Sequence, residues 1–305
     1  MDKILLNDGN QIPVIGFGPG GAGYSAKYKK SPKSKFIALS QRVWNKFISR
    51  PLIYRDYVSA VSSALNNGFN LLDYSAAYGN GTLIGKAIKK SGMRRDDIFL
   101  TTRVSNRAQF NGNIETEFFE QLKNIGTDYI DLLMFHWPVT NKYVDTYKKM
   151  IKLKEKGFVR TLGVANCHQH HLITLINETG VVPSINQFEV HPLFTQKTLL
   201  AFCKEHGITV EAYTPVARFD DRLMRLPLLK KIGEKYGKSI IQVVLRWHIQ
   251  NGLIPVVRTL NERHQKENLD IFDFVLTNDE IKAIDGININ SRLRYDPDNC
   301  DFTIL

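Results

Sequence analysis

The chain has few cysteines, and none of them has the spacing that marks a metal site. Cys167, Cys203 and Cys300 are odd in number and stand far apart in a chain of 305 residues. Closely spaced cysteines would predict a zinc site, and an even set in a short chain would predict a disulfide framework. The observed pattern is typical of a protein from a reducing compartment, so we expect a cytoplasmic protein.

The sequence also lacks an apolar run of about 18 residues, the length needed to cross a membrane. It begins MDKILLNDGN, where charges and a turn replace the apolar core of a secretory signal. We therefore expect neither a membrane span nor a signal peptide. Hydrophobic residues still make up 43% of the chain, which is enough to bury a large core.

Recognition patterns for nucleic acids are absent as well. The net charge of +11 could attract nucleic acids, anionic substrates or the phosphates of a cofactor. However, Lys and Arg alternate with Asp and Glu outside one segment, without a recognition helix, a zinc finger or an RNA-binding motif. We expect a small-molecule partner and no nucleic acid. No G-x-G-x-x-G in the context of a Rossmann strand–helix unit follows the first predicted strand, so we do not expect a Rossmann dehydrogenase.

Short apolar runs alternate with amphipathic stretches along the whole chain. Because the runs are apolar nearly throughout, they predict parallel strands covered on both faces. Asn67-Gly68, Lys156-Gly157, His206-Gly207 and Asn251-Gly252 mark helix ends. Eight strand–helix units favour a closed (β/α)₈ TIM barrel over an open sheet. The predicted strands are 13–17, 70–74, 98–103, 129–136, 160–165, 184–189, 209–214 and 253–258; the predicted helices are 52–68, 81–91, 114–125, 143–156, 168–178, 196–206, 225–249 and 261–268.

The opening LLNDGNQIP predicts a β-hairpin with an Asp-Gly turn ahead of the first barrel strand. Length alone would allow two domains, but a barrel of roughly 250 residues is a single domain. No linker, low-complexity tract or repeat divides the chain. We therefore expect one domain over residues 1–305.

Polar residues stand at the ends of the predicted strands, where a barrel carries its chemistry. Four of them are titratable and follow three successive strands, which indicates a proton-transfer cluster. Singly, each has an ordinary structural explanation, such as a turn cap or a buried histidine. The titratable residues are Asp73, Tyr78, Arg103 and His136, and Asn166, Gln187 and Tyr213 end the next three strands.

The same residues occur in stretches that resemble the aldo-keto reductase family. The stretches are IPVIGFG, D-YSAA-YGN at 73–80, DYIDLLMFHWP at 128–138, LGVANC at 162–167, INQFEVHP at 185–192, VEAYTPVA at 210–217 and RTLNERHQKENLDIFDFVLT at 258–277. They cover nearly the whole chain in order. The YGKSIIQVVLRW stretch and the RYDPD tail resemble prokaryotic members of the diketogluconate reductase type.

The resemblance implies reversible hydride transfer between NAD(P)H and a carbonyl group. Tyr78 would donate the proton, and a neighbouring cation would lower its pKa from the ordinary value of about 10. Asp73 would hold that cation, and His136 would orient the carbonyl oxygen. Trp137 would line the substrate pocket.

Two departures from the family pattern change this site. Relatives have a lysine where this chain has Arg103, whose planar guanidinium keeps its charge but cannot lose a proton. We expect altered or slowed carbonyl reduction, not an inactive site. Pro19 and Gly20 replace the usual Thr-Trp at the substrate pocket, which removes an aromatic wall and a hydroxyl.

The positions implied to bind the cofactor are better preserved. Asn166 and Gln187 would bind the carboxamide, and Tyr213 would stack on the nicotinamide. Ala165 replaces a usual serine. A cation suits a 2′-phosphate, so we expect NADPH, with NADH possible. The residues implied at the adenosine end are Arg258, Thr259, His264, Glu267 and Asn268, with His264 in place of an arginine.

Three closely spaced histidines do not predict a metal site. His168, His170 and His171 fall at a helix start, and no acidic or thiol residue has a spacing that would complete a closed site. The implied mechanism needs no metal. We therefore expect none.

A basic insertion at about 21–52 distinguishes this chain from compact relatives. From Gly21 to Arg55 it carries nine Lys and Arg residues and no acid. Apolar residues near helical spacing predict an amphipathic helix over 35–49. Three interpretations remain open: a solvated loop, a lid over an acidic or bulky substrate, or a docking surface for an acidic carrier with a tethered substrate.

Three functions remain open, because a fold alone does not decide function. The first is NADPH-dependent reduction of a small carbonyl compound. The second is a redox-neutral isomerase or epimerase that recycles bound NADP, in which the fixed cation Arg103 stabilises an enolate. The third is a nucleotide-sensing binding protein with weak catalysis. We expect a monomer.

Overall fold

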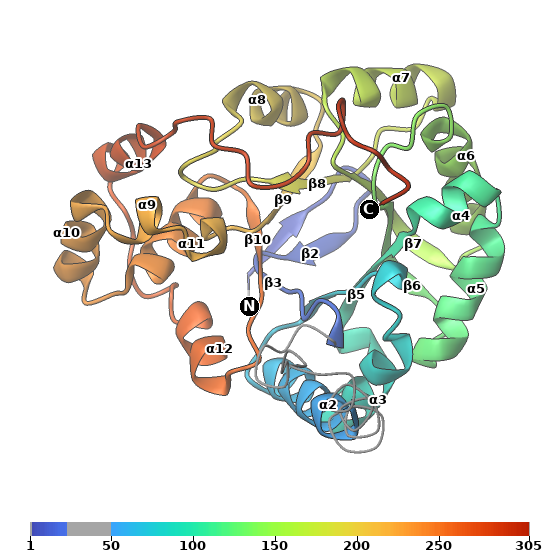
Figure 1. Cartoon of the computed structure of the whole chain (residues 1–305), viewed down its shortest axis with the longest axis horizontal. Helices are drawn as coiled ribbons and strands as arrows, with labels where there is room; N and C mark the ends of the chain where they lie inside the picture. Colours follow the sequence, from blue (N-terminus) through green and yellow to red (C-terminus); the bar gives the residue numbers. More distant parts are fainter. Residues whose placement is uncertain (1, 23–49, 305) are drawn as a thin grey trace, which may run out of the picture.

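Eight parallel strands close into a barrel (Figure 1). The computed structural model describes residues 2–22 and 50–304. Around the barrel the strands follow chain order, and β10 pairs with both β9 and β3 to close the ring. The predicted (β/α)₈ barrel is therefore confirmed. The strands are β3 (Gly16–Phe17), β4 (Leu71–Asp73), β5 (Phe99–Val104), β6 (Ile130–Phe135), β7 (Val159–Ala165), β8 (Ile185–Glu189), β9 (Thr209–Tyr213) and β10 (Ile254–Val257).

Helices surround the strands in Figure 1. The glycines at 68, 157, 207 and 252 all have positive φ, as the predicted helix ends require. The α-helices are α2 (Arg50–Asn66), α3 (Gly81–Ser91), α4 (Asn106–Asn111), α5 (Ile114–Ile125), α6 (Tyr143–Glu155), α7 (Gln169–Thr179), α8 (Lys197–Glu205), α9 (Asp221–Met224), α10 (Pro227–Tyr236), α11 (Ile240–Gln250), α12 (Glu262–Leu269) and α13 (Asn278–Asp285).

The single helix predicted over 225–249 is wrong, because the chain forms two helices there. Gly237 ends α10 in the left-handed conformation, with φ of 65°. Ser239 then begins α11 with a capping box, in which its hydroxyl accepts from Gln242 and the Gln242 side chain accepts from the Ser239 amide. Short α4 and α9, and α13 near the C-terminus, also escaped the sequence analysis.

The predicted hairpin is present and closes one end of the barrel. Strands β1 (Lys3–Leu5) and β2 (Gln11–Pro13) are antiparallel, and Gly9 in the turn has φ of 84°. Leu6 and Ile12 pack against an apolar layer at the N-terminal side of the barrel strands, formed by Leu71, Leu132, Met134, Ile185 and Ile254. The hairpin therefore completes an apolar floor at this end of the barrel.

The predicted helix over 35–49 and most of the basic insertion at about 21–52 lie outside the described residues. Within the ranges 2–22 and 50–304, no helix combines the length and the apolar character that crossing a membrane requires.

Candidate active site

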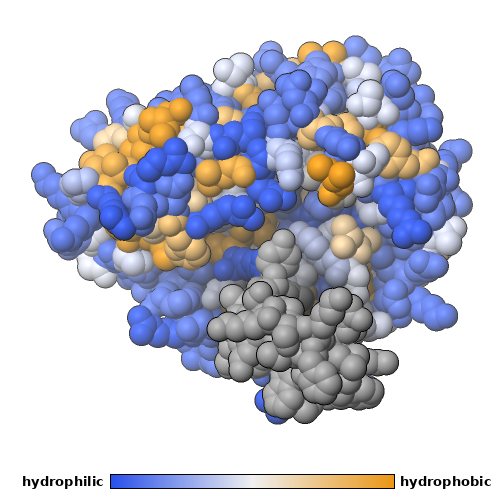
Figure 2. All heavy atoms as spheres, in the orientation of Figure 1, coloured by the Kyte–Doolittle hydropathy of each residue, from blue (hydrophilic) through white to orange (hydrophobic). Residues whose placement is uncertain are grey.

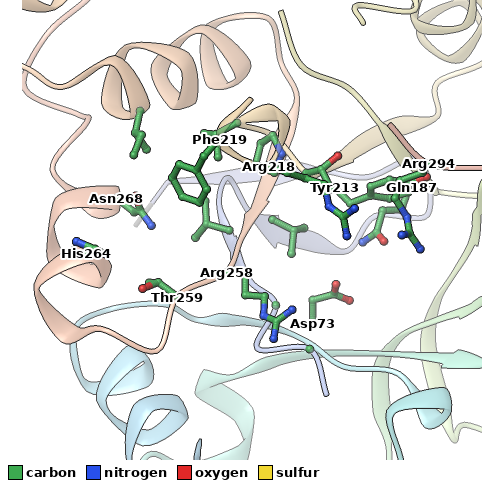
Figure 3. Close-up of a pocket in the computed structure, with 18 of the residues that line it drawn as sticks. Asp73, Gln187, Tyr213, Arg218, Phe219, Arg258, Thr259, His264, Asn268 and Arg294 are labelled. Carbon is green, nitrogen blue, oxygen red and sulfur yellow. The ribbon is translucent and has the colours of Figure 1, made fainter. Parts of the chain in front are cut away.

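A cavity of about 940 Å³ lies at the C-terminal ends of the barrel strands. Figure 2 shows this face hollowed near its centre, and Figure 3 shows part of the cavity lining. Pro19 is buried and does not line the cavity, contrary to the prediction, whereas Gly20 does. The cavity brings together all the other predicted site residues: Asp73, Tyr78, Arg103, His136, Trp137, Asn166, Gln187, Tyr213, Arg258, Thr259, His264, Glu267 and Asn268.

Tyr78 ends a short 3-10 helix, η4 (Ala76–Tyr78), directly after β4. The residue is 39% exposed, which leaves it accessible from the cavity that it lines. Burial of the phenol raises its pKa above the ordinary value, while the charges of Arg103 and Arg258 act in the opposite direction. The cations therefore lower the pKa of Tyr78 as expected, but the effect of burial is larger. Tyr78 stays protonated at neutral pH, as a proton donor must.

Arg103 is fully buried and contacts three residues, Asp73, Tyr74 and Gln187. Its Nη2 atom lies 2.7 Å from Oδ1 and 2.9 Å from Oδ2 of Asp73. Nη1 donates to the main-chain oxygen of Tyr74 at 2.7 Å, and Nη2 also donates to Oε1 of Gln187. The guanidinium thus reaches across the barrel from β5 to both β4 and β8, and its rigid planar group fixes the position of the charge.

Glu211, on β9, is a buried carboxyl below Gln187. Its Oε2 atom accepts from Nε2 of Gln187 at 2.7 Å, and Oε1 has no hydrogen-bond partner in the described part of the chain. Burial raises the pKa of Glu211 to about 8, and the nearby charge of Asp73 adds to this effect. Glu211 is therefore mainly protonated at neutral pH. Glu211 lies in the stretch VEAYTPVA, but the sequence predicts no role for it.

His136 follows β6 and is neutral at physiological pH. Burial, together with the charges of Arg103 and Arg294, lowers its pKa to about 3. A neutral imidazole carries one N–H donor, so His136 can donate to a carbonyl oxygen in the cavity.

Trp137, next in the chain, lines the cavity and is shielded from solvent by the C-terminal tail. The tail residue Phe302 packs against it, with ring centroids 6.4 Å apart. No local pattern in the sequence identifies Phe302 as part of this wall.

Two side chains expected to bind a carboxamide already have partners. Asn166 donates to the main-chain oxygen of His136 at 2.9 Å and accepts from the Tyr213 hydroxyl at 2.7 Å. Gln187 contacts Arg103 and Glu211. Each amide group retains a second N–H, so both side chains can still donate to a ligand.

Gly20 makes room for Arg258. A Cβ atom on Gly20 would lie 3.1 Å from Cζ of Arg258, and the residue has φ of 65°. Tyr57 and Asn80 hold this loop by donating to the Gly20 main-chain oxygen at 2.8 and 3.0 Å. Figure 3 shows the Arg258 side chain directed toward Asp73. To bind a 2′-phosphate as predicted, Arg258 would have to turn away from this position.

The other end of the cavity has the chemistry of a nucleotide site. Figure 3 places Thr259, His264 and Asn268 there, on and before α12. Thr214 lines the cavity, and its buried hydroxyl has no hydrogen-bond partner among the described residues. Such an orphaned group, in a cavity that several arginines line, fits a dinucleotide phosphate. The sequence did not reveal five further lining residues: Arg218, Phe219, Ser239, Gln242 and Arg263.

The loop after β9 has an unusual backbone. Ala217, Arg218 and Phe219 have φ of 49°, 55° and 62°, which is costly for residues other than glycine. Arg218 and Phe219 both line the cavity. Backbone strain of this kind concentrates at ligand-binding sites, which agrees with the loop's position.

The C-terminal tail reaches the cavity because Glu189 fixes its main chain. The two carboxylate oxygens of Glu189, at the end of β8, accept from the amides of Leu293 at 2.7 Å and Arg294 at 2.9 Å. His191 also contacts Oε1, at 2.9 Å. Although burial alone would raise the pKa of Glu189, these hydrogen bonds lower it below the ordinary value. Arg294 thereby lines the cavity, a role that sequence analysis did not foresee.

An acidic residue does accompany the three histidines, although no spacing in the sequence predicts it. Asp298 of the tail lies 2.7 Å from Nδ1 of His168 and 3.3 Å from Nε2 of His170. However, Nδ1 of His171 accepts from the main-chain amide of His168, which leaves the proton of the neutral ring on Nε2. The Arg292 guanidinium also contacts His168 at 3.3 Å. These contacts link the start of α7 to the tail.

Comparison with known proteins identifies the family. Residues 44–289 match the Aldo/keto reductase family. An aldo-keto reductase of Mycolicibacterium smegmatis is 37% identical over 303 residues, covering 99% of this chain and 98% of the relative. Methylglyoxal reductase DkgA of Escherichia coli is 36% identical over 297 residues, with 97% and 96% covered. The Bombyx mori aldo-keto reductase solved in complex with NADP is 30% identical, with a TM-score of 0.81 and 97% and 96% covered. The chain therefore belongs to the aldo-keto reductase family.

Proposed function

We propose that the chain is an NADPH-dependent reductase that converts an aldehyde or ketone to an alcohol, with Tyr78 as the proton donor. The observation that carries the proposal is one continuous cavity. It has a protonated phenol, a neutral imidazole and a buried arginine–carboxylate pair at one end, and the chemistry of a nucleotide site at the other. A bound NADPH would supply the hydride.

Each residue at the catalytic end has a distinct part in the proposed reaction. Tyr78 gives its phenolic proton to the carbonyl oxygen as negative charge develops there. His136 donates a hydrogen bond to the same oxygen and fixes its orientation. Arg103, held by Asp73, stabilises the phenolate that remains, because the guanidinium keeps its positive charge at every relevant pH.

The adenosine end supports NADPH over NADH. Asn268, Thr259 and His264 offer polar contacts there, and Arg263 adds a cation that an uncharged ribose would not need. The solved Bombyx mori relative binds NADP. We infer that kcat/KM is higher with NADPH than with NADH, and that Arg263→Gln narrows this difference.

The test of the reductase proposal follows loss of the reduced nicotinamide absorbance with methylglyoxal and a set of simple aldehydes and ketones. Tyr78→Phe should lower kcat/KM by at least about 100-fold, the contribution typical of general acid catalysis. Nucleotide binding, measured by fluorescence, should persist in this variant. Tyr54→Phe changes an exposed tyrosine on α2 and is the matched control. Equal activity of the two variants would contradict the assignment of Tyr78.

The same assays separate the two alternatives. A redox-neutral isomerase would incorporate solvent deuterium into its product without net consumption of NADPH. A nucleotide-sensing protein would bind NADPH tightly and turn over no substrate, even as the Arg103→Lys variant. Reduction by the wild-type chain, with the expected loss in Tyr78→Phe, would exclude both.

A further inference from the structure

Arg294 is one of the cations in the cavity to which the proposed reaction gives no part. Arg294 lines the cavity together with Tyr78, His136 and Trp137. It comes from the C-terminal tail, which Figure 1 shows running from α13 past β8 and α8. The tail thus adds a positive charge to the wall where a carbonyl substrate would be held.

Arg294 lies at the catalytic end of the cavity. Figure 3 shows it beside Gln187 and Tyr213, while His264 and Asn268 stand on the opposite side. The phosphates of a dinucleotide bound at the opposite side would be neutralised there. Arg294 is therefore available to bind a different anion.

The position of Arg294 is fixed in advance. Its main-chain amide donates to buried Glu189, and so does the amide of Leu293. Hydrogen bonds to a buried carboxylate are stronger than those between neutral groups. The main chain of the tail is therefore ordered before a ligand binds, and binding loses little conformational entropy there.

The guanidinium has no carboxylate partner within 4 Å in the described part of the chain, and its carbon lies 5.7 Å from the centroid of the Tyr295 ring. Both oxygens of Glu189 are occupied by main-chain amides, and one of them by His191 as well. Residues 23–49 contain no Asp or Glu that could neutralise it. A cation without a partner in a cavity attracts an anionic ligand.

We propose that Arg294 binds an anionic group of the substrate, so that the substrate is an aldehyde or ketone that also carries a carboxylate or a phosphate. This inference rests on the proposed reductase function. The charge of Arg294 also acts on the pKa of both Tyr78 and His136, which agrees with a location within reach of a small substrate held by those residues.

The experiment compares substrates that differ only in charge. 4-Oxobutanoate and its methyl ester form the carboxylate pair, and D-glyceraldehyde 3-phosphate and D-glyceraldehyde form the phosphate pair. The ratio of kcat/KM between the charged and neutral member is measured for the wild type, Arg294→Gln, Arg294→Lys and Arg292→Gln. Arg292 is the matched control, because its guanidinium lies 4.7 Å from the Phe194 ring and contacts His168.

In the wild type, the charged member of at least one pair should be preferred, and the pair that shows the preference identifies the anion. Arg294→Gln should lower this ratio by about 10- to 100-fold, mainly through KM, as expected for a lost charged hydrogen bond. Arg294→Lys should restore part of it, and Arg292→Gln should leave it unchanged. Added salt should lower kcat/KM for the charged member only.

Two outcomes would overturn the inference while the reductase function stands. One is a wild-type chain that reduces both members of each pair with equal efficiency. The other is an Arg294→Gln variant that loses equal activity toward both members and shows a shifted pH profile, which would mean that Arg294 acts on Tyr78 and not on the substrate. If no carbonyl compound is reduced by the wild type, the proposed function itself fails.

Discussion

Arg103 and Asp73 form a buried ion pair in which one nitrogen of the guanidinium lies within 2.9 Å of both carboxylate oxygens. The sequence resemblance implies that Arg103 stands in place of a lysine, and this remains a prediction. An arginine is longer than a lysine, and here it also reaches Gln187. The guanidinium thus joins the catalytic end to a residue expected to bind the nicotinamide carboxamide.

Removing one partner of the Arg103–Asp73 pair should destabilise the folded protein. Arg103→Met leaves the Asp73 carboxylate buried without a cation, so we expect the free energy of unfolding to fall by about 3–5 kcal/mol. The free energy of unfolding should fall less in the double variant Asp73→Asn/Arg103→Met than the sum of the losses in the two single variants. Urea unfolding followed by circular dichroism measures both effects. Additive losses would show that the two groups do not interact.

Arg103→Lys tests the catalytic side of the same pair. The lysine keeps the charge beside Asp73 but is too short and too narrow to keep all the contacts of the guanidinium. We expect this variant to fold and to retain carbonyl reduction, with a new ionisation in the basic limb of its pH–rate profile, because lysine can lose a proton and arginine cannot. An unchanged profile would contradict the assigned place of Arg103 beside Tyr78.

Glu211 should give the protein a pH-dependent stability. Its pKa is about 8 in the folded chain, whereas an unfolded glutamate has a pKa near the ordinary value of 4.5. The contribution of the protonated carboxyl is therefore complete below about pH 4.5 and is lost as the pH rises toward about 8. The melting temperature should fall over this window, and Glu211→Gln, which cannot ionise, should show a flatter profile. Glu205→Gln, an exposed position on α8, is the control.

Glu189 should determine how firmly the C-terminal tail is held. Glu189→Gln offers one acceptor oxygen in place of two, so only one of the amides of Leu293 and Arg294 keeps its partner. We expect a loss of about 1–3 kcal/mol in stability and faster hydrogen exchange at these two amides. Asp298→Asn disturbs a different tail contact, that with His168, and should leave exchange at 293 and 294 unchanged.

Gly20 and Arg258 offer a test with a well-matched control. Gly20→Ala places a methyl group 3.1 Å from the Arg258 guanidinium in a left-handed backbone. Gly9→Ala meets a similar backbone cost in the hairpin, where no heavy atom lies within 4 Å. Both variants should lose about 1–2 kcal/mol in the free energy of unfolding, but only Gly20→Ala should alter kcat/KM. An equal effect of both on turnover would mean that the position of Arg258 does not matter to catalysis.

Much of the fold could be predicted from the sequence because the barrel strands are apolar nearly throughout and glycines end the helices. The break between α10 and α11 was missed, although the Ser239-x-x-Gln242 capping box that begins α11 is visible in the sequence. Thr277 and Glu280 form a similar box at the start of α13. A single domain over 1–305 with an insertion at about 21–52 stays a prediction, because 23–49 lie outside the described residues.

The site was predictable where topology alone determines it. Residues at the C-terminal ends of parallel strands must gather at one end of a barrel, and Asp73, Arg103 and Gln187 do so. Long-range contacts decided the rest. Arg294 reaches the cavity through Glu189, 105 residues earlier, and the acidic partner of His168 lies 130 residues away. No local pattern in a single sequence carries that information.

The hairpin at the floor of the barrel affects how fast the interior responds to its surroundings. Below Glu211 the barrel is filled by apolar side chains that the hairpin residues Leu6 and Ile12 complete. Protons from bulk water therefore reach Glu211 mainly through the mouth of the barrel. A ligand bound in the cavity would slow the ionisation of Glu211 after a sudden change in acidity.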